Sequence, residues 1–142
     1  MAPIWRNWLN LWCGGVIVLG LIFLGSGLPA TDWGVRLYFD AMAWPIDGKG
    51  WEEAARLTAM VLGAVMMGWG VTMLILVRVA IENPHLRLFV PLTGAILVWW
   101  LGDTSLSFVL GSPGNATANT LFLIAYLIPV IASGALKQPK AQ

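Results

Sequence analysis

One acidic residue, Asp103, lies inside a long apolar stretch of the sequence, and it is the first candidate for chemistry. A carboxylate near the centre of a lipid-embedded helix costs about 2.5 to 3.5 kcal/mol on insertion scales, so it calls for a partner. Arg56 begins another apolar stretch, and its guanidinium could supply the opposite charge. We expect the two side chains to meet, which would either hold a proton, an ion or a polar headgroup, or only fix which helices are neighbours.

Polar and aromatic residues recur around Asp103 at spacings of three and four, which place side chains on one face of a helix. One such stripe consists of Trp99, Trp100, Asp103 and Ser107. A second stripe, in the last apolar stretch, consists of Asn115, Asn119, Phe122 and Tyr126. The predicted ligand-binding residues are Arg56, Trp100, Asp103, Ser107, Asn115 and Asn119. The alternative is that these groups only bond one helix to another, at about 0.6 kcal/mol per hydrogen bond.

Four apolar runs must position these residues, and they cover residues 11–28, 54–77, 88–110 and 117–136. Each run approaches or exceeds the ~20 residues that a helix needs to cross a bilayer. Hydrophobic residues make up 58% of the chain and charged residues 11%, against about 25% charged residues in soluble domains. Lipid cannot solvate unpaired backbone groups, so each crossing is helical. We predict an all-α integral membrane four-helix bundle, with residues 1–142 forming a single transmembrane domain.

The first connection, residues 29–53, is the only long one, and it contains a short amphipathic pattern. Asp32 is placed to cap a helix, and apolar residues follow it at helical spacing: Trp33, Leu37, Tyr38, Ala41 and Trp44. This pattern predicts a short helix lying on the outer surface of the bilayer. The second connection, at residues 82–85, is a tight turn, which favours side-by-side packing of the second and third spans.

Basic residues divide unequally between the two sides of the predicted bundle. One side carries Arg6, Arg78, Arg87, Lys137 and Lys140, and the other carries Arg36, Lys49 and Arg56. Positive residues concentrate on the cytoplasmic side of membrane proteins. We therefore expect both termini in the cytoplasm and a location in the cell inner membrane.

The tryptophans and small residues predict how the helices pack. Trp5, Trp8 and Trp12 lie before or at the start of the first apolar run and are assigned to the aromatic belt at the membrane surface. For the tryptophans near mid-span, Trp69, Trp99 and Trp100, core packing is favoured over an aromatic ligand pocket.

The second span contains two pairs of small residues, Ala59/Gly63 and Ala64/Gly68. Such pairs let helices approach closely, and packing inside the bundle is favoured over contact with another chain. Pro129 is expected to kink the fourth span and free a carbonyl.

Several classes of function lack the residues they need. Eight basic and seven acidic residues give a net charge of +1, which argues against a nucleic-acid partner. One cysteine and one histidine cannot build a multi-ligand zinc or bis-histidine haem site. A lone carboxylate without a histidine, thiol or metal ligand nearby does not form a catalytic constellation. We expect no enzyme activity, no metal and no cofactor.

Three segments carry a family resemblance: residues 62–70 (LGAVMMGWG), 103–107 (DTSLS) and 115–120 (NATANT). With them the chain resembles small uncharacterised bacterial four-span proteins of DoxX-like architecture, over most of its length. The resemblance implies a fold and a membrane location, and it implies no reaction.

Two functions of different classes follow from these features. The sequence favours a non-enzymatic accessory or stabilising component of a larger membrane complex. Its expected partners are the lipid bilayer and other membrane-protein subunits, or a second copy of the chain. The alternative is a small carrier or sensor with an outward-facing polar pocket around Asp103 for a proton, an ion or a small polar ligand.

Overall fold

The computed structural model describes residues 1–42 and 53–137, and every regular element within these ranges is helical. Four long helices carry the apolar runs: α1 (Pro3–Leu24), α3 (Glu53–Glu82), α4 (Phe89–Val109) and α5 (Pro113–Ala132). All four are long and apolar enough to cross a membrane, so the chain is a multi-pass membrane protein with an all-α four-helix architecture. The first helix begins well before residue 11, because Pro3 occupies its first turn, where the fixed proline φ suits a helix start.

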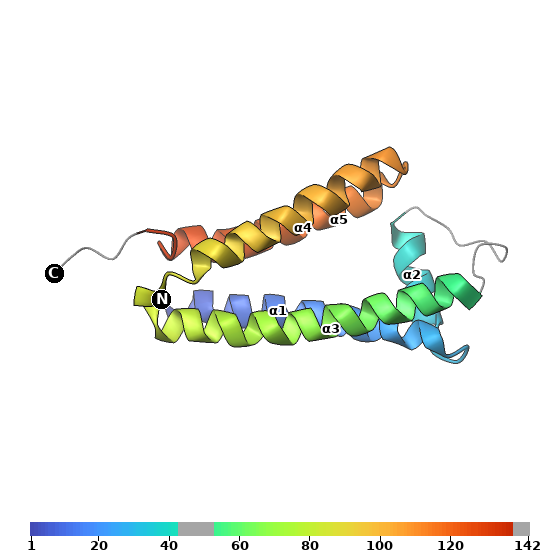
Figure 1. The fold of residues 1–142 in the computed structure, drawn as a ribbon, viewed down its shortest axis with the longest axis horizontal. Coiled ribbons are helices and arrows are strands. Elements are labelled where there is room, and N and C mark those ends of the chain that lie inside the picture. The colour runs from blue at the N-terminus through green and yellow to red at the C-terminus, as the bar shows by residue number, and fades with distance from the viewer. Residues whose placement is uncertain (43–52, 138–142) are drawn as a thin grey trace.

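The four helices form two antiparallel pairs (Figure 1). Helix α3 packs along α1, helix α4 packs along α5, and the main contact between the pairs is made by α1 with α5. Figure 1 shows the pairs close together at the end that carries the N-terminus and spread apart toward the opposite end. The expected side-by-side packing of the second and third spans is therefore wrong. The tight turn around Pro84–Leu86 joins α3 to α4 without making them close neighbours.

Small residues explain why α1 is the partner of α3. A Cβ atom added to Gly63 would collide with the backbone of Leu24 and lie 2.6 Å from the carbonyl oxygen of Gly20. A Cβ atom added to Gly20 would lie 2.8 Å from the backbone nitrogen of Met67. Only glycine permits this separation, which brings the two backbones into direct contact. The internal role expected for the pair Ala59/Gly63 is confirmed, since both residues are buried.

The other small pair does not take part in this interface. Ala64 and Gly68 lie on the exposed side of α3, and a Cβ atom added to Gly68 would meet nothing within 4 Å. The internal role expected for this second pair is therefore wrong. The two pairs differ because Ala59 and Gly63 face α1 while Ala64 and Gly68 are turned away from the bundle.

Two tryptophans of α1 connect the helix pairs. The indole nitrogen of Trp12 donates a hydrogen bond to the carbonyl of Phe122 at 3.0 Å, and that of Trp8 donates to the carbonyl of Ala125 at 2.8 Å. Pro129 lies inside α5 and has no N–H to donate to the carbonyl of Ala125 four residues earlier. Trp8 thus supplies the donor that Pro129 lacks.

This arrangement corrects the assignment of Trp12 to the aromatic belt, whereas Trp8 is exposed. Trp12 is only 5% exposed, and its ring stacks on Phe122 with the ring centroids 4.4 Å apart. It belongs to a core that also contains Leu9, Val16, Ile96, Tyr126 and Val130. Helix α1 begins at Pro3, before the apolar run, so Trp12 lies inside the helix and not at its end.

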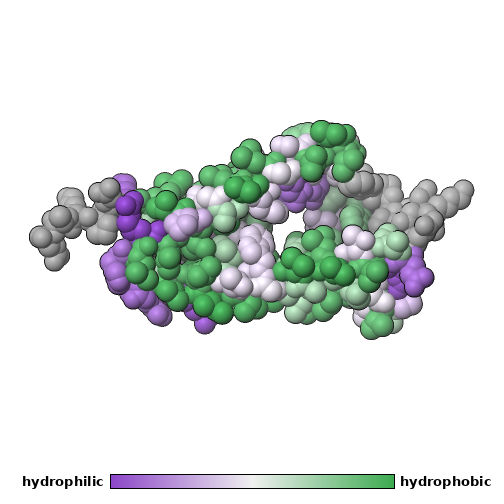
Figure 2. All heavy atoms as spheres, in the orientation of Figure 1, coloured by the Kyte–Doolittle hydropathy of each residue, from purple (hydrophilic) through white to green (hydrophobic). Residues whose placement is uncertain are grey.

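The charged residues lie at the ends of the helices. Arg6, Arg78, Arg87 and Lys137 are at or near the end that carries the N-terminus, the α3–α4 turn and the end of α5, whereas Arg36 and Arg56 are at the end that carries α2 (Trp33–Ala41). Figure 2 shows hydrophilic residues at both ends and apolar residues covering most of the surface between them. Trp44, Lys49 and Lys140 lie outside the described residues.

Candidate functional site

The spreading of the two helix pairs leaves a cavity of about 600 Å³ between them. Figure 2 shows an opening in the surface where the pairs separate. Most of the cavity wall is apolar, and it includes six aromatic side chains: Phe23, Tyr38, Phe39, Trp69, Trp99 and Phe122. Polar residues of α4 and α5 and the residue preceding α5 complete the wall: Asp103, Ser112, Asn115 and Asn119. This combination of a large apolar wall and a few polar groups is typical of small-molecule sites.

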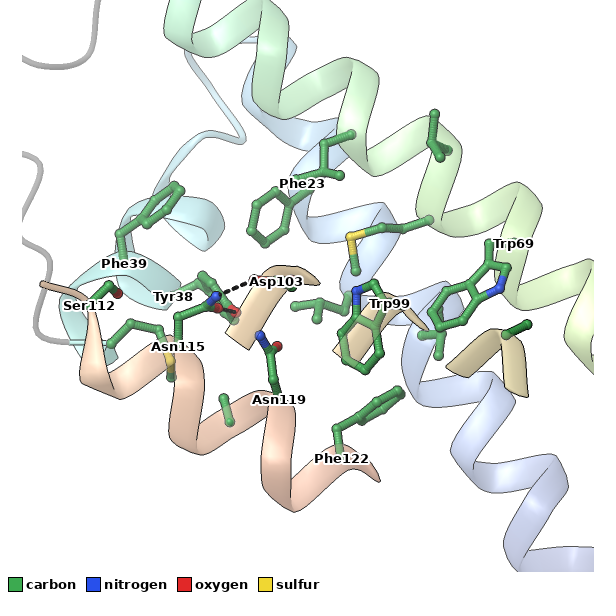
Figure 3. A pocket seen from close by; sticks show the side chains of 18 residues that line it. Phe23, Tyr38, Phe39, Trp69, Trp99, Asp103, Ser112, Asn115, Asn119 and Phe122 are labelled. Atoms are coloured by element: carbon green, nitrogen blue, oxygen red, sulfur yellow. Dashed lines mark hydrogen bonds between the residues drawn. The ribbon is translucent and has the colours of Figure 1, made fainter. Parts of the chain in front are cut away.

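A hydrogen-bond network holds Asp103 in the cavity wall (Figure 3). The side-chain nitrogen of Asn115 donates to Oδ1 of Asp103 at 2.9 Å and to Oγ of Ser107 at 2.8 Å. The Oγ of Ser107 lies 2.7 Å from the backbone carbonyl oxygen of Asp103 and 3.2 Å from its Oδ1. The hydroxyl of Tyr38 donates to the amide oxygen of Asn115 at 3.3 Å. The structure therefore brings Asp103, Ser107 and Asn115 together.

Two other polar groups line the cavity without hydrogen-bond partners. Asn119 is 7% exposed, and its Nδ2 atom has no partner; Ser112 is 3% exposed, and its Oγ atom has none either. Figure 3 shows Asn119 reaching from α5 into the cavity, between Asn115 and Phe122. A buried polar group that lacks a hydrogen bond costs about 1 to 3 kcal/mol. A bound molecule with a polar group at this end of the cavity would remove that cost.

Arg56 does not pair with Asp103, so the predicted ion pair is wrong. The Nε atom of Arg56 donates to the carbonyl oxygen of Ser26 at 3.2 Å, and the Oγ of Ser26 donates to the carbonyl oxygen of Arg56 at 3.1 Å. The short helix Gly25–Gly27 ends α1 beside the first turns of α3 and takes up this arginine. In the described part of the chain the only ion pair joins Arg36 and Asp32, so Asp103 has no basic partner there.

Trp100 is not part of the cavity wall, although its neighbour Trp99 is. The indole nitrogen of Trp100 donates to Oγ1 of Thr120 at 3.2 Å, which connects α4 to α5. Successive residues of a helix point about 100° apart, so only one of the two tryptophans can face the cavity. Tyr126 also lies outside it, buried, with its hydroxyl 3.1 Å from Oγ1 of Thr93.

Helix α2 supplies site residues that the sequence did not indicate. Val35 is fully buried, and Phe23 of α1 packs edge-on against Tyr38 and Phe39, with ring centroids 5.0 and 5.9 Å apart. The predicted amphipathic helix is confirmed. Some of its apolar side chains face the interior of the protein, and others face outward. Trp33 and Leu37 are exposed, whereas Tyr38 and Phe39 line the cavity. No sequence signal pointed to the side facing α1.

The position of Tyr38 also has an electrostatic consequence. Burial raises the pKa of its hydroxyl above the ordinary value of 10.0, and the negative charge of Asp103 raises it further. Tyr38 therefore remains a neutral hydrogen-bond donor to Asn115 throughout the physiological range. Among the described residues at the polar end of the cavity, the one that carries a formal charge is Asp103.

Comparisons with protein-family models, with curated proteins and with solved structures each returned no match. The resemblance to DoxX-like four-span proteins stays a prediction.

Proposed function

We propose that this chain is a non-enzymatic membrane protein that binds one small amphiphilic molecule in the cavity between its helix pairs, as a carrier or a sensor. One observation carries the proposal: a cavity of about 600 Å³ has an aromatic wall and a polar end where the buried Nδ2 of Asn119 lacks a partner. Such a wall favours an apolar body, and the polar end favours a head that forms hydrogen bonds.

The packing around the cavity supports binding rather than simple interhelical bonding. Interhelical hydrogen bonds would be expected to satisfy each buried polar group, as Trp100 and Thr120 do. The cavity places two unpartnered groups, those of Asn119 and Ser112, beside an apolar wall, whereas the unpartnered atoms of Asn10, Arg56 and Thr104 lie away from it. An apolar wall next to such groups suits a guest that enters from the membrane.

The test measures binding of three pyrene derivatives, pyrenemethylamine, pyrenemethanol and pyrenecarboxylate, to the purified protein in phosphatidylcholine nanodiscs. Binding is followed by energy transfer from tryptophan to pyrene, with empty nanodiscs as the baseline. Ala118 lines the cavity, so Ala118→Phe should fill part of it and weaken every derivative that binds by about tenfold or more. Ala64→Phe places the same ring on the exposed side of α3 and should leave the affinities unchanged. Equal binding by the wild type and Ala118→Phe would contradict the proposal.

A second proposal is the accessory or stabilising role in a larger membrane complex. It is supported by Ala64 and Gly68, a small pair that this chain does not use for its own packing. Such a pair allows a helix of another subunit, or of a second copy, to approach closely. A particle with the mass of a single chain and no co-purifying protein, after mild extraction, would count against this role.

The location is also a proposal. With more basic residues at the end that carries both the N-terminus and the α3–α4 turn, the positive-inside rule favours cytoplasmic termini in a cell inner membrane. The cavity then lies toward the outer half of the bilayer, because α2 and the polar end of the cavity are at the opposite end. Labelling of cysteines placed near residue 2 and in α2, in intact cells, tests this orientation.

A further inference from the structure

The charge of the cavity wall restricts the kind of molecule that fits. Of the described residues that line the cavity, Asp103 is the only one with a formal charge. Its two side-chain donors among the described residues, Asn115 and Ser107, approach the same oxygen, Oδ1, and Oδ2 has no donor among these residues. A carboxylate in an apolar cavity without a counter-charge is costly, because low-polarity surroundings solvate it poorly.

A guest with a positive head would supply the missing counter-charge. An uncharged guest would leave Asp103 without one, and an anionic guest would be repelled. A charged amine would also donate to the oxygen that has no donor, and charge-assisted hydrogen bonds are about twice as strong as neutral ones.

The aromatic wall favours the same kind of guest. Phe23, Tyr38 and Trp99 come from three different helices, α1, α2 and α4, and all face the cavity that contains Asp103 (Figure 3). The face of an aromatic ring carries partial negative charge and attracts cations, most strongly for tryptophan. Such rings suit an organic cation, because they can pack against its apolar body and attract its positive charge.

On the basis of the proposed function, we infer that the ligand is a lipophilic organic cation whose ammonium group pairs with the carboxylate of Asp103 while its apolar body lies against the aromatic wall. A carrier and a sensor would both bind a ligand of this class.

The experiment compares the affinities of the three pyrene derivatives at neutral pH, where the amine is positive, the alcohol neutral and the carboxylate negative. All three share one ring system, so differences in affinity report on charge. The wild-type protein should bind pyrenemethylamine at least about tenfold more tightly than pyrenemethanol, and pyrenecarboxylate most weakly. Subtracting the signal of empty phosphatidylcholine nanodiscs removes partitioning into lipid.

Variants then assign the preference to one residue. Asp103→Asn keeps the shape of the side chain and removes its charge, so the amine should lose its advantage while pyrenemethanol binds within about twofold of its wild-type affinity. Asp103→Glu should keep the preference for the amine. Glu53→Gln removes an exposed acid from the first turn of α3 and should leave the preference unchanged.

The outcomes separate this inference from the proposed function. If the wild type binds amine and alcohol equally, while Ala118→Phe weakens both, the cavity is a binding site without charge preference and the inference is overturned. If none of the derivatives binds, the proposed function fails and the inference fails with it. The wild-type comparison needs no substitution, so it decides the inference even where Asp103→Asn does not fold.

Discussion

Replacing Gly63 with alanine tests the close contact between α1 and α3 on which the rest of the fold depends. The added Cβ atom would collide with the backbone of Leu24 and lie 2.6 Å from the carbonyl oxygen of Gly20. Ordinary contact begins at 3.4 Å, so the two helices must separate by at least about 0.8 Å at this point. Both obstacles are backbone atoms, which cannot turn aside as a flexible side chain can.

The size of the effect follows from two opposing contributions. Overpacking of a well-packed interface costs about 1 to 3 kcal/mol, and a gap of 0.5 to 1 Å forfeits about a quarter to a half of each dispersion contact along the interface. Alanine favours the helix over glycine by about 1 kcal/mol, which offsets part of that cost. Because the collision involves the backbone of both helices, we expect Gly63→Ala to lower the free energy of unfolding by about 2 kcal/mol.

Gly68→Ala is the matched control on the same helix. Nothing lies within 4 Å of its added Cβ atom, so only the helix preference of alanine acts and stability should be unchanged or slightly higher. The assay is reversible unfolding of the purified protein in mixed micelles of a mild detergent and dodecyl sulfate, followed by circular dichroism. Equal stability of the two variants would refute the close packing of α1 on α3.

Two further predictions concern hydrogen bonds that join the elements. Trp8→Phe removes the donor to the carbonyl of Ala125 and should lower the free energy of unfolding by about 0.6 to 1.7 kcal/mol in the same assay. The control variant Trp33→Phe, at an exposed position of α2, should have little effect on stability. Equal losses of stability in the two variants would contradict the role of Trp8. Burial, and then the charge of Asp103, raises the pKa of Tyr38 in the folded protein, so the stabilisation by its neutral hydroxyl is complete below pH 10 and is lost as the pH rises through the raised pKa. Unfolding measured against pH should show this alkaline loss in the wild type and a smaller one in Tyr38→Phe; identical pH profiles would contradict it.

The sequence was sufficient to locate the polar residues of the candidate site in the third and fourth spans. It was not sufficient to determine which other side chains lie next to them. The spacing of Asp103 and Ser107, and of Asn115 and Asn119, depends only on helix geometry, and the structure brings Asp103, Ser107 and Asn115 into one network. The same spacing could not tell which of two neighbouring tryptophans faces the cavity. That depends on the rotation of α4 about its own axis, which its contacts with α5 determine.

The error over Arg56 has a similar cause. The predicted pair of Arg56 and Asp103 assumes that both residues lie toward one side of the membrane and that the tight turn makes their helices neighbours. The pairing required α3 and α4 to be close neighbours, but α3 packs against α1, and Arg56 bonds to Ser26 where α1 ends. A turn constrains the ends of two helices and leaves the rest free to diverge.

The sequence by itself determined that this is a four-span helical membrane protein. The length and apolarity of each run are local properties, and lipid permits a run of that kind to satisfy its backbone only as a helix. Only the tertiary structure decided which helices pair, that α2 lines a cavity, and that Asp103 has no basic partner among the described residues. These outcomes depend on close contacts between residues far apart in the chain, such as Gly20 with Gly63 and Trp8 with Ala125, and no local pattern encodes which of the possible contacts will form.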